Sequence, residues 1–305
     1  MLGNPDGSAP AFGLKIDRCT FFFLPGVPRE YQRILMESIL PRLVHAAGHA
    51  ALRTRILQCY GIAESRLDEV VARIRAQHPE VRFGFRTKFP ENHLSLAALA
   101  HDDETAARSL ATVETKCREV LAAFIYGADG VTFAQSLGEQ LAGRGETICC
   151  AESCTGGLAT QLLTEVSGSS RWTTGAFVVY SNSLKESALG VPADLIRSHG
   201  AVSEPVARAM AEGARRASGA TWAAAITGIA GPDGGTPEKP VGTVFLAVAG
   251  PGISRTKHSQ YRGDRGQVRT LAAYGALQLV REAIGAPSLA RLFWEVDHGA
   301  SAGKA

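Results

Sequence analysis

The chain has 305 residues, more than one compact core usually requires, so two or three domains are expected. Hydrophobic residues make up 45% and charged residues 20% of it, a globular composition that excludes wholesale disorder. The 32 basic side chains nearly balance the 29 acidic ones, which argues against dominant binding to nucleic-acid phosphates. No apolar run approaches the roughly 20 residues that span a bilayer, and the N-terminus lacks a signal-peptide pattern. We therefore expect a cytoplasmic protein without membrane contact.

Six cysteines are scattered along the chain without CxxC spacing. This distribution signals neither a zinc site nor a disulfide framework, so reduced and mostly buried thiols are expected. No other cluster of metal-ligand residues stands out, and we expect neither a metal nor a cofactor.

Residues 1–46 contain a turn-rich run, one strand-like run (TFFFLPGVP) and a helical pattern from Arg29 to about Val44 that Pro41 interrupts. One strand and one helix are too little to close a core. We interpret this segment as the remnant of a larger α/β domain.

Residues 50–128 predict a small two-layer module of the order β-α-β-β-α, with its second helix running from Asp103 to about Ile125. Some nucleic-acid-binding modules share this layout. The segment has no GxxG backbone clamp and no stacked-aromatic motif, however, which favours a structural or spacing role.

Residues 131–286 alternate between short apolar strands and helical patterns, and predict an α/β sandwich with a central sheet covered by helices. The expected strands are 147–151, 175–180, 222–226, 242–248 and 255–261. The expected helices are 132–142, one that begins near Leu158, and others near 184–189, 203–217 and 265–284. Residues 287–305 end in small polar residues and predict a tail.

Ser153 lies where a predicted strand meets a predicted helix, next to Gly156 and Gly157. Glycine N–H groups at such a junction can point at an anion, although a tight turn with a capping hydroxyl explains the same pattern. Tyr180 and Lys185 follow the next strand, and the ends of parallel strands converge on one crevice. A buried lysine near Ser153 could activate its hydroxyl as a base.

Two further elements could contact a ligand at the same crevice. The loop 227–240 has four glycines and three prolines between two strands, and Thr227 could donate a hydrogen bond to a substrate. Arg265 and Arg269 are spaced i, i+4 on one helix face, where they could hold a phosphate. Surface arginines explain that spacing equally well.

Competing nucleophiles are poorly supported. Residues 131–286 have neither a GxSxG elbow nor an HExxH motif and contain only two histidines, which disfavours a Ser-His-Asp triad there. Cys154 is a more reactive residue type than Ser153, but it lacks an evident histidine partner. The thiol remains an alternative nucleophile.

Five segments resemble the CinA C-terminal family, which includes the nicotinamide mononucleotide deamidases. They are AESCTGG (151–157), VVYSN (178–182) with Lys185, GAVS (200–203), the run 227–244, and RGDR (262–265). The resemblance implies hydrolysis of the carboxamide of nicotinamide mononucleotide to nicotinate mononucleotide and ammonia, in pyridine nucleotide salvage. It makes Ser153 the nucleophile, Lys185 the general base and Tyr180 a hydrogen-bond partner. The expected substrate contacts are Thr155, Gly156, Gly157, Thr227, Gly228, Gly231, Arg265 and Arg269. The phosphate would suit either the helix start at Gly156 and Gly157 or the two arginines.

The N-terminal part resembles the rest of full-length CinA proteins incompletely. Residues 7–13 and 23–28 are similar to the end of their molybdopterin-binding-like domain, and 50–128 is similar to their small middle domain. The segment that would carry the family's ADP-ribose pyrophosphatase site has no counterpart, so we predict no such activity. The resemblance also suggests a homodimer. The alternative to an enzyme is a non-catalytic partner protein linked to competence or DNA damage.

Overall fold

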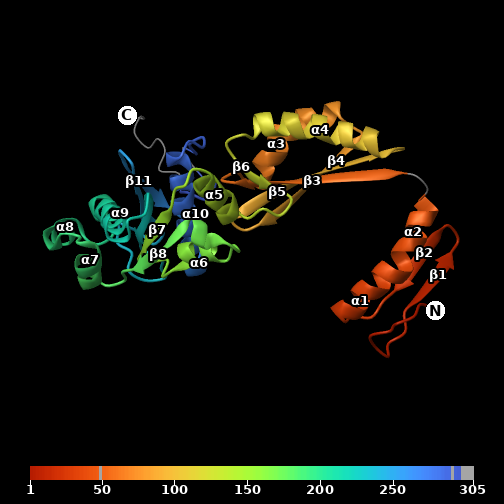
Figure 1. Cartoon of the computed structure of the whole chain (residues 1–305), viewed down its shortest axis with the longest axis horizontal. Helices are drawn as coiled ribbons and strands as arrows, with labels where there is room; N and C mark the ends of the chain where they lie inside the picture. The colour runs from red at the N-terminus through yellow and green to blue at the C-terminus, as the bar shows by residue number, and fades with distance from the viewer. Residues whose placement is uncertain (48–49, 290–291, 297–305) are drawn as a thin grey trace. The chain divides into compact units, whose positions relative to one another are not determined.

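A computed structural model describes residues 1–47, 50–289 and 292–296 (Figure 1). The chain divides into two compact units. One comprises Met1–Arg53 with Ala98–Leu110, and the other comprises Thr54–Ala97 with the chain from Ala111 onward. The structure is mixed α/β, and no helix in its described residues is both long enough and apolar enough to cross a membrane.

The first unit contains an antiparallel hairpin followed by helices. Strands β1 (Phe12–Ile16) and β2 (Cys19–Phe23) pair from Phe12 opposite Phe23. Helices α1 (Pro28–Ile34) and α2 (Leu40–Ala47) are joined by a π-helical turn over Leu35–Ile39. The sequence predicted only one strand here, because glycines and prolines surround β1 and hide its pattern. The π-helical turn ends two residues before Pro41, and such irregularities accommodate proline rings in helices.

The middle of the chain forms a four-stranded sheet. Its strands are β3 (Ala51–Tyr60), β4 (Val81–Lys88), β5 (Glu91–Ala100) and β6 (Ile125–Ala128), in the order β4-β5-β3-β6. Helix α3 (Glu64–Gln77) follows β3, and α4 (Asp103–Val120) follows β5. The predicted second helix was too long, because Ile125 belongs to β6, which pairs with β3. Two alanines extend the helical pattern past Val120, but the aromatic and β-branched residues of 124–126 favour a strand.

Residues from Phe133 onward build a five-stranded sheet in the order β11-β10-β9-β7-β8. Strand β7 (Ile148–Glu152) is parallel to both β8 (Thr173–Val178) and β9 (Trp222–Gly228). Strands β10 (Thr243–Gly250) and β11 (Ile253–Gln260) extend the sheet in antiparallel fashion. The carboxyl ends of β7, β8 and β9 therefore meet at one edge of the sheet.

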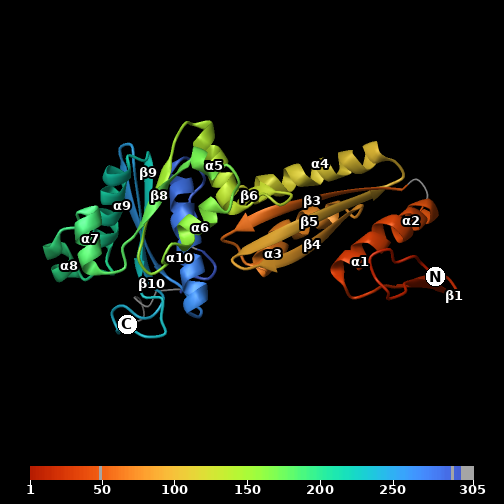
Figure 2. The ribbon, with the colours of Figure 1, turned by 60° about the horizontal axis from the view of Figure 1, so that its bottom comes forward.

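Helices cover both faces of this sheet and make a three-layer sandwich (Figure 2). Alternation along β7 sends Ile148 and Cys150 into one core and Cys149 and Ala151 into the other. The first core contains α5 (Phe133–Gly143), α6 (Leu158–Thr164) and α10 (Arg265–Ala283). The second contains α7 (Asn182–Leu189), α8 (Ala193–His199) and α9 (Glu204–Ser218).

The end of the chain contributes to the first core. Leu289, Leu292 and Trp294 are buried there, and Glu295 bridges Tyr261 in antiparallel fashion. Part of the segment 287–305 that was predicted as a tail is therefore packed, while residues 297–305 of that prediction lie outside the described residues.

Candidate active site

The carboxyl ends of the three parallel strands carry the predicted site. Ser153 directly follows β7, Tyr180 lies two residues after β8, and Thr227 occupies the end of β9. Strand ends of this kind are where open α/β sheets bind ligands. The polar residues that follow apolar strands in the sequence therefore lie at one edge of the folded sheet.

Ser153 and Lys185 contact each other at this edge. The distance between Lys185 Nζ and Ser153 Oγ is 3.2 Å, and both residues are buried, with 1% of Lys185 and 8% of Ser153 exposed. Lys185 lies in the first turns of α7, which begins where the Ser181 side chain accepts a hydrogen bond from the Leu184 N–H. The cap at Ser181 fixes the start of α7 and thereby the direction of the lysine.

The surroundings of Lys185 shift its amine toward the neutral form. Burial lowers the pKa of Lys185 below its ordinary value, and among the described residues no carboxylate lies within ion-pair distance of it. Its Nζ donates to the carbonyl oxygens of Val179 (2.9 Å) and Tyr180 (3.1 Å). A neutral amine has two N–H bonds, so these two carbonyls use both and leave the lone pair available to accept the Ser153 hydroxyl proton.

Glu152 organises the turn that follows Ser153. Its fully buried carboxylate accepts hydrogen bonds from the N–H groups of Gly157 (3.0 Å), Ala159 (3.1 Å) and Thr160 (2.9 Å), and from the Thr160 hydroxyl (2.6 Å). The first N–H groups of α6 are therefore occupied by the protein's own anion. The Gly157 N–H, which the sequence offered as an anion contact, therefore donates to Glu152 in this structure.

Sequence reasoning did not single out Glu152. The signal was present, because an acidic residue at the end of a buried strand, just before a glycine turn and a helix, can cap that helix. Gly156 and Gly157 adopt φ angles of +62° and +100°, and this left-handed backbone folds the turn back so that the helix start faces Glu152.

Backbone donors remain next to Ser153. The Ser153 N–H donates to Ile226 O (3.0 Å) and the Gly156 N–H donates to Ser153 O (3.1 Å). Within the described chain, the N–H groups of Cys154 and Thr155 donate to no other group. The buried Thr155 hydroxyl also has no hydrogen-bond partner there. These groups could stabilise negative charge that develops on a substrate beside the serine oxygen.

Both predicted arginines lie at the site and hold its loops. Arg269 Nη2 donates to Thr155 O at 2.7 Å, and Arg265 Nη1 donates to Gly231 O at 2.7 Å. Each guanidinium has five N–H groups, so both retain donors for an anion. Helix α10 thereby connects the turn after β7 with the loop after β9.

The residues near the end of β9 are used for packing. The Thr227 hydroxyl donates to Ala201 O at 2.8 Å, and only 1% of Thr227 is exposed. A Cβ at Gly228 would lie 2.7 Å from the Val244 side chain, so this glycine allows β9 and β10 to approach each other. Sequence reasoning placed Thr227 correctly at the strand end, but its hydroxyl is already engaged.

Two remaining candidates have surroundings that bear on their roles. Tyr180 is 65% exposed, and it is its carbonyl oxygen that meets Lys185. Cys154 is buried, and burial raises the pKa of its thiol to about 12. A thiol so far from ionisation is a poor nucleophile at neutral pH, which disfavours the cysteine alternative. No group of three or more His, Cys, Asp or Glu residues placed to hold a metal occurs in the described part of the chain.

Comparisons with known proteins agree with this architecture. The family described as CinA C-terminal domain matches residues 131–284, and the damage-inducible protein CinA KH domain matches residues 54–127. A CinA-like protein of Myxococcus xanthus is 45% identical over 284 residues, which cover 92% of this chain and 68% of that protein. A CinA-like protein of Anaeromyxobacter sp. is 44% identical over 287 residues, covering 93% and 69%.

Solved structures match about half of the chain. The competence/damage inducible protein CihA from Agrobacterium tumefaciens is 38% identical with a TM-score of 0.48, covering 50% of this chain and 92% of that one. The sequence matches extend over nearly the whole chain, and the two domain families occur in order within it. The chain therefore belongs to the CinA family.

Proposed function

We propose that the protein is a nicotinamide mononucleotide amidohydrolase in which Ser153 is the nucleophile and Lys185 its general base. One observation carries the proposal: a buried lysine amine, with no carboxylate partner among the described residues, lies 3.2 Å from a serine oxygen at the carboxyl edge of a parallel sheet. The substrate follows from the resemblance of the five sequence segments to the deamidases of the same family.

In the first half of the reaction, Ser153 Oγ attacks the carboxamide carbon as its proton passes to Lys185 Nζ. The carbonyl oxygen becomes an oxyanion, which the N–H groups of Cys154 and Thr155, unused by the described residues, are available to stabilise. The C–N bond then breaks, and the proton on Lys185 passes to the departing nitrogen, so that ammonia leaves and an ester on Ser153 remains.

In the second half, water attacks the ester and gives its proton to the neutral Lys185 amine. The bond between the carbonyl carbon and Ser153 Oγ breaks, and the lysine returns the proton to the serine oxygen. Nicotinate mononucleotide leaves, and both side chains regain their starting protonation states. Lys185 serves as base and acid in turn, a role that its lowered pKa suits.

Arg265 and Arg269 are the proposed phosphate ligands. Each donates a hydrogen bond to a loop carbonyl and has further N–H groups to offer, whereas the first N–H groups of α6 are occupied by Glu152. Thr155, Gly156, Gly228 and Gly231 are proposed to line the substrate through the backbone of the two loops. We further propose that the exposed Tyr180 side chain is a hydrogen-bond partner in the reaction.

The proposed enzyme needs no metal or cofactor and acts in the cytoplasm as a homodimer, in pyridine nucleotide salvage. These parts of the proposal rest on the resemblance. Sedimentation of the purified chain tests the dimer directly, and ammonia release in the presence of a chelator tests the metal independence. A chain that sediments as a monomer at all concentrations, or an activity abolished by the chelator, would contradict them.

The decisive assay is ammonia release from nicotinamide mononucleotide by the purified chain, with Ser153→Ala beside it. We expect turnover by the parent and a loss of about 10³-fold or more in the variant. Cys154→Ala is the matched control, because it removes the neighbouring nucleophilic side chain and should keep most of the activity.

The substrate is tested with nicotinamide riboside, which lacks the phosphate. The parent should prefer the nucleotide, and Arg269→Ala should reduce that preference chiefly through KM. If the folded parent releases no ammonia from the nucleotide, the amidase proposal fails, and the non-catalytic partner protein becomes the better description.

A further inference from the structure

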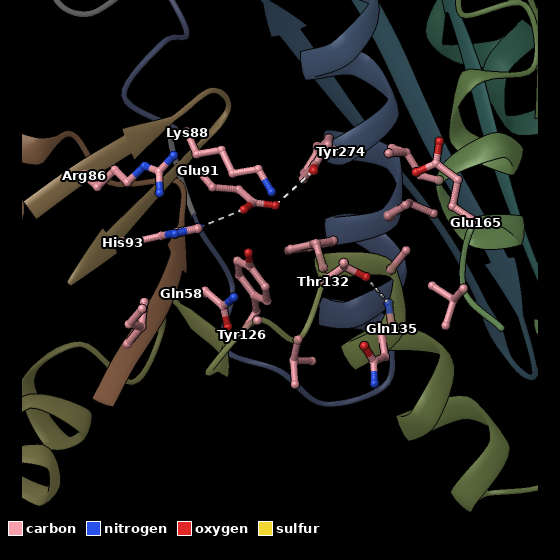
Figure 3. A pocket seen from close by; sticks show the side chains of 18 of the residues that line it. Gln58, Arg86, Lys88, Glu91, His93, Tyr126, Thr132, Gln135, Glu165 and Tyr274 are labelled. Atoms are coloured by element: carbon pink, nitrogen blue, oxygen red, sulfur yellow. Dashed lines mark hydrogen bonds and ion pairs between the residues drawn. The ribbon is translucent and has the colours of Figure 1, made fainter. Parts of the chain in front are cut away.

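A cavity with a volume of about 680 Å³ lies in the larger unit. None of the residues that line it belongs to the Ser153 site. Figure 3 shows Arg86, Lys88, His93 and Gln58 on one side of it, and Thr132, Gln135 and Glu165 on the other. A concave site of this volume matches the size range of small-molecule pockets.

Two cations at this cavity form no ion pair within the described part of the chain. Arg86 and Lys88 lie two residues apart on β4, so their side chains point to the same face of the strand. Both are exposed, and neither forms an ion pair with any described residue. The cavity therefore offers one guanidinium and one ammonium to an anionic group.

A buried acceptor in the same cavity is also unused. Gln58 on β3 is only 4% exposed, and its Oε1 has no hydrogen-bond partner among the described residues. Buried amide oxygens are almost always paired, so this one marks a place where a ligand could supply an N–H group. The unpaired Gln58 oxygen is an observation independent of the two cations, because Gln58 lies on a different strand.

Hydrogen bonds of Glu91 fix the side chains that line the cavity between these groups. The Glu91 carboxylate accepts a hydrogen bond from the Tyr274 hydroxyl (2.9 Å) and contacts His93 Nε2 (3.0 Å), and only 5% of Glu91 is exposed (Figure 3). Apolar and aromatic side chains complete the lining, among them Ile56, Phe133, Leu162 and Leu277. Such a lining suits a planar ring better than a sugar alone.

We propose that this cavity binds a mononucleotide with an amino-bearing base. Its phosphate contacts Arg86 and Lys88, its base lies against the apolar wall, and the amino group of the base donates to Gln58 Oε1. Glu165, on the opposite side, can accept hydrogen bonds from sugar hydroxyls. This cavity is separate from the Ser153 site, so the binding proposal does not depend on the deamidation proposal.

Isothermal titration of the full chain with AMP tests the proposal, with adenosine and IMP as comparison ligands. Arg86→Ala/Lys88→Ala should weaken AMP binding by about tenfold or more and change adenosine binding by less than about twofold. Both side chains are exposed, so the variant should fold. Arg82→Ala is the matched control, because Arg82 is an exposed arginine of the same strand that does not line the cavity.

Gln58→Leu tests the base contact separately. The parent should bind AMP more tightly than IMP, which carries a carbonyl in place of the amino group, and the variant should lose that preference. The proposal is overturned if AMP shows no saturable binding, or if the double variant binds AMP like the parent. It is also overturned if AMP competes with the substrate for the Ser153 site with the same constant that titration gives.

Discussion

Replacing Lys185 by methionine removes the amine and keeps most of the buried stem. The variant loses all three hydrogen bonds of Nζ, to Ser153 Oγ, Val179 O and Tyr180 O. Loss of a general base lowers rates by about 10²–10⁴-fold, so we expect kcat/KM for ammonia release to fall within that range. Stability should change by less than about 2 kcal/mol, because two carbonyls lose a donor while an amine no longer has to be buried.

The pH dependence gives this prediction a definite sign. Burial lowers the pKa of Lys185 in the folded state, so the unfolded chain binds the proton more tightly. Burying the protonated amine lowers the free energy of unfolding. This cost has its full size below the folded-state pKa and disappears as the pH rises to the ordinary pKa of 10.5. The parent should therefore gain stability relative to Lys185→Met over that interval. The kcat/KM of the parent should rise with pH through the same lowered pKa, since the base must be neutral.

Urea unfolding of both proteins from pH 7 to 10.5 measures the first effect, and initial rates of ammonia release measure the second. Lys185→Arg provides a further comparison, because it keeps a donor but cannot lose its proton. Parental activity in Lys185→Met, or a stability difference that stays constant over the whole pH range, would refute the reasoning.

Three further outcomes are expected. Glu152→Gln should lower stability by about 2–4 kcal/mol in urea unfolding, because an amide brings N–H groups into a site where four donors converge; an unchanged midpoint would contradict the role of this carboxylate. Gly213→Ala should destabilise by about 1–3 kcal/mol, since its Cβ would lie 2.1 Å from Leu189 O, whereas Gly143→Ala has open space and should be neutral or stabilising. Of the six thiols, only Cys19 is exposed, so a thiol reagent should modify one cysteine rapidly in the native protein and six in denaturant; rapid modification of a second thiol would show that a buried cysteine is accessible.

The central strands could be predicted because their residues are apolar on both faces. The run from Trp222 to Ile226 was predicted as a strand and is the main part of β9. Strands β1 and β6 were missed, since each is short and is stabilised by pairing with a partner that local patterns do not reveal. Helix α8 was missed because it has only seven residues between Pro192 and Gly200.

The candidate site was predictable to the extent that it follows from strand ends. Ser153 and Lys185 were singled out because each follows a strand, and parallel strands bring such residues together. The partner of the α6 N–H groups was not predicted, because the sequence pattern indicates an anion site without showing which anion occupies it. The turn at Gly157 folds back onto Glu152 only through its left-handed backbone, a tertiary detail that spacing does not determine.

The proposed nucleophile can be tested most directly by trapping the ester that it forms. The chain is mixed with nicotinamide mononucleotide, quenched in acid within the first turnover, digested, and analysed by peptide mass spectrometry. The account predicts an adduct of the nucleotide less ammonia on the Ser153 hydroxyl, present in Cys154→Ala and absent in Ser153→Ala. An adduct on Cys154, or parental ammonia release from Ser153→Ala, would contradict it.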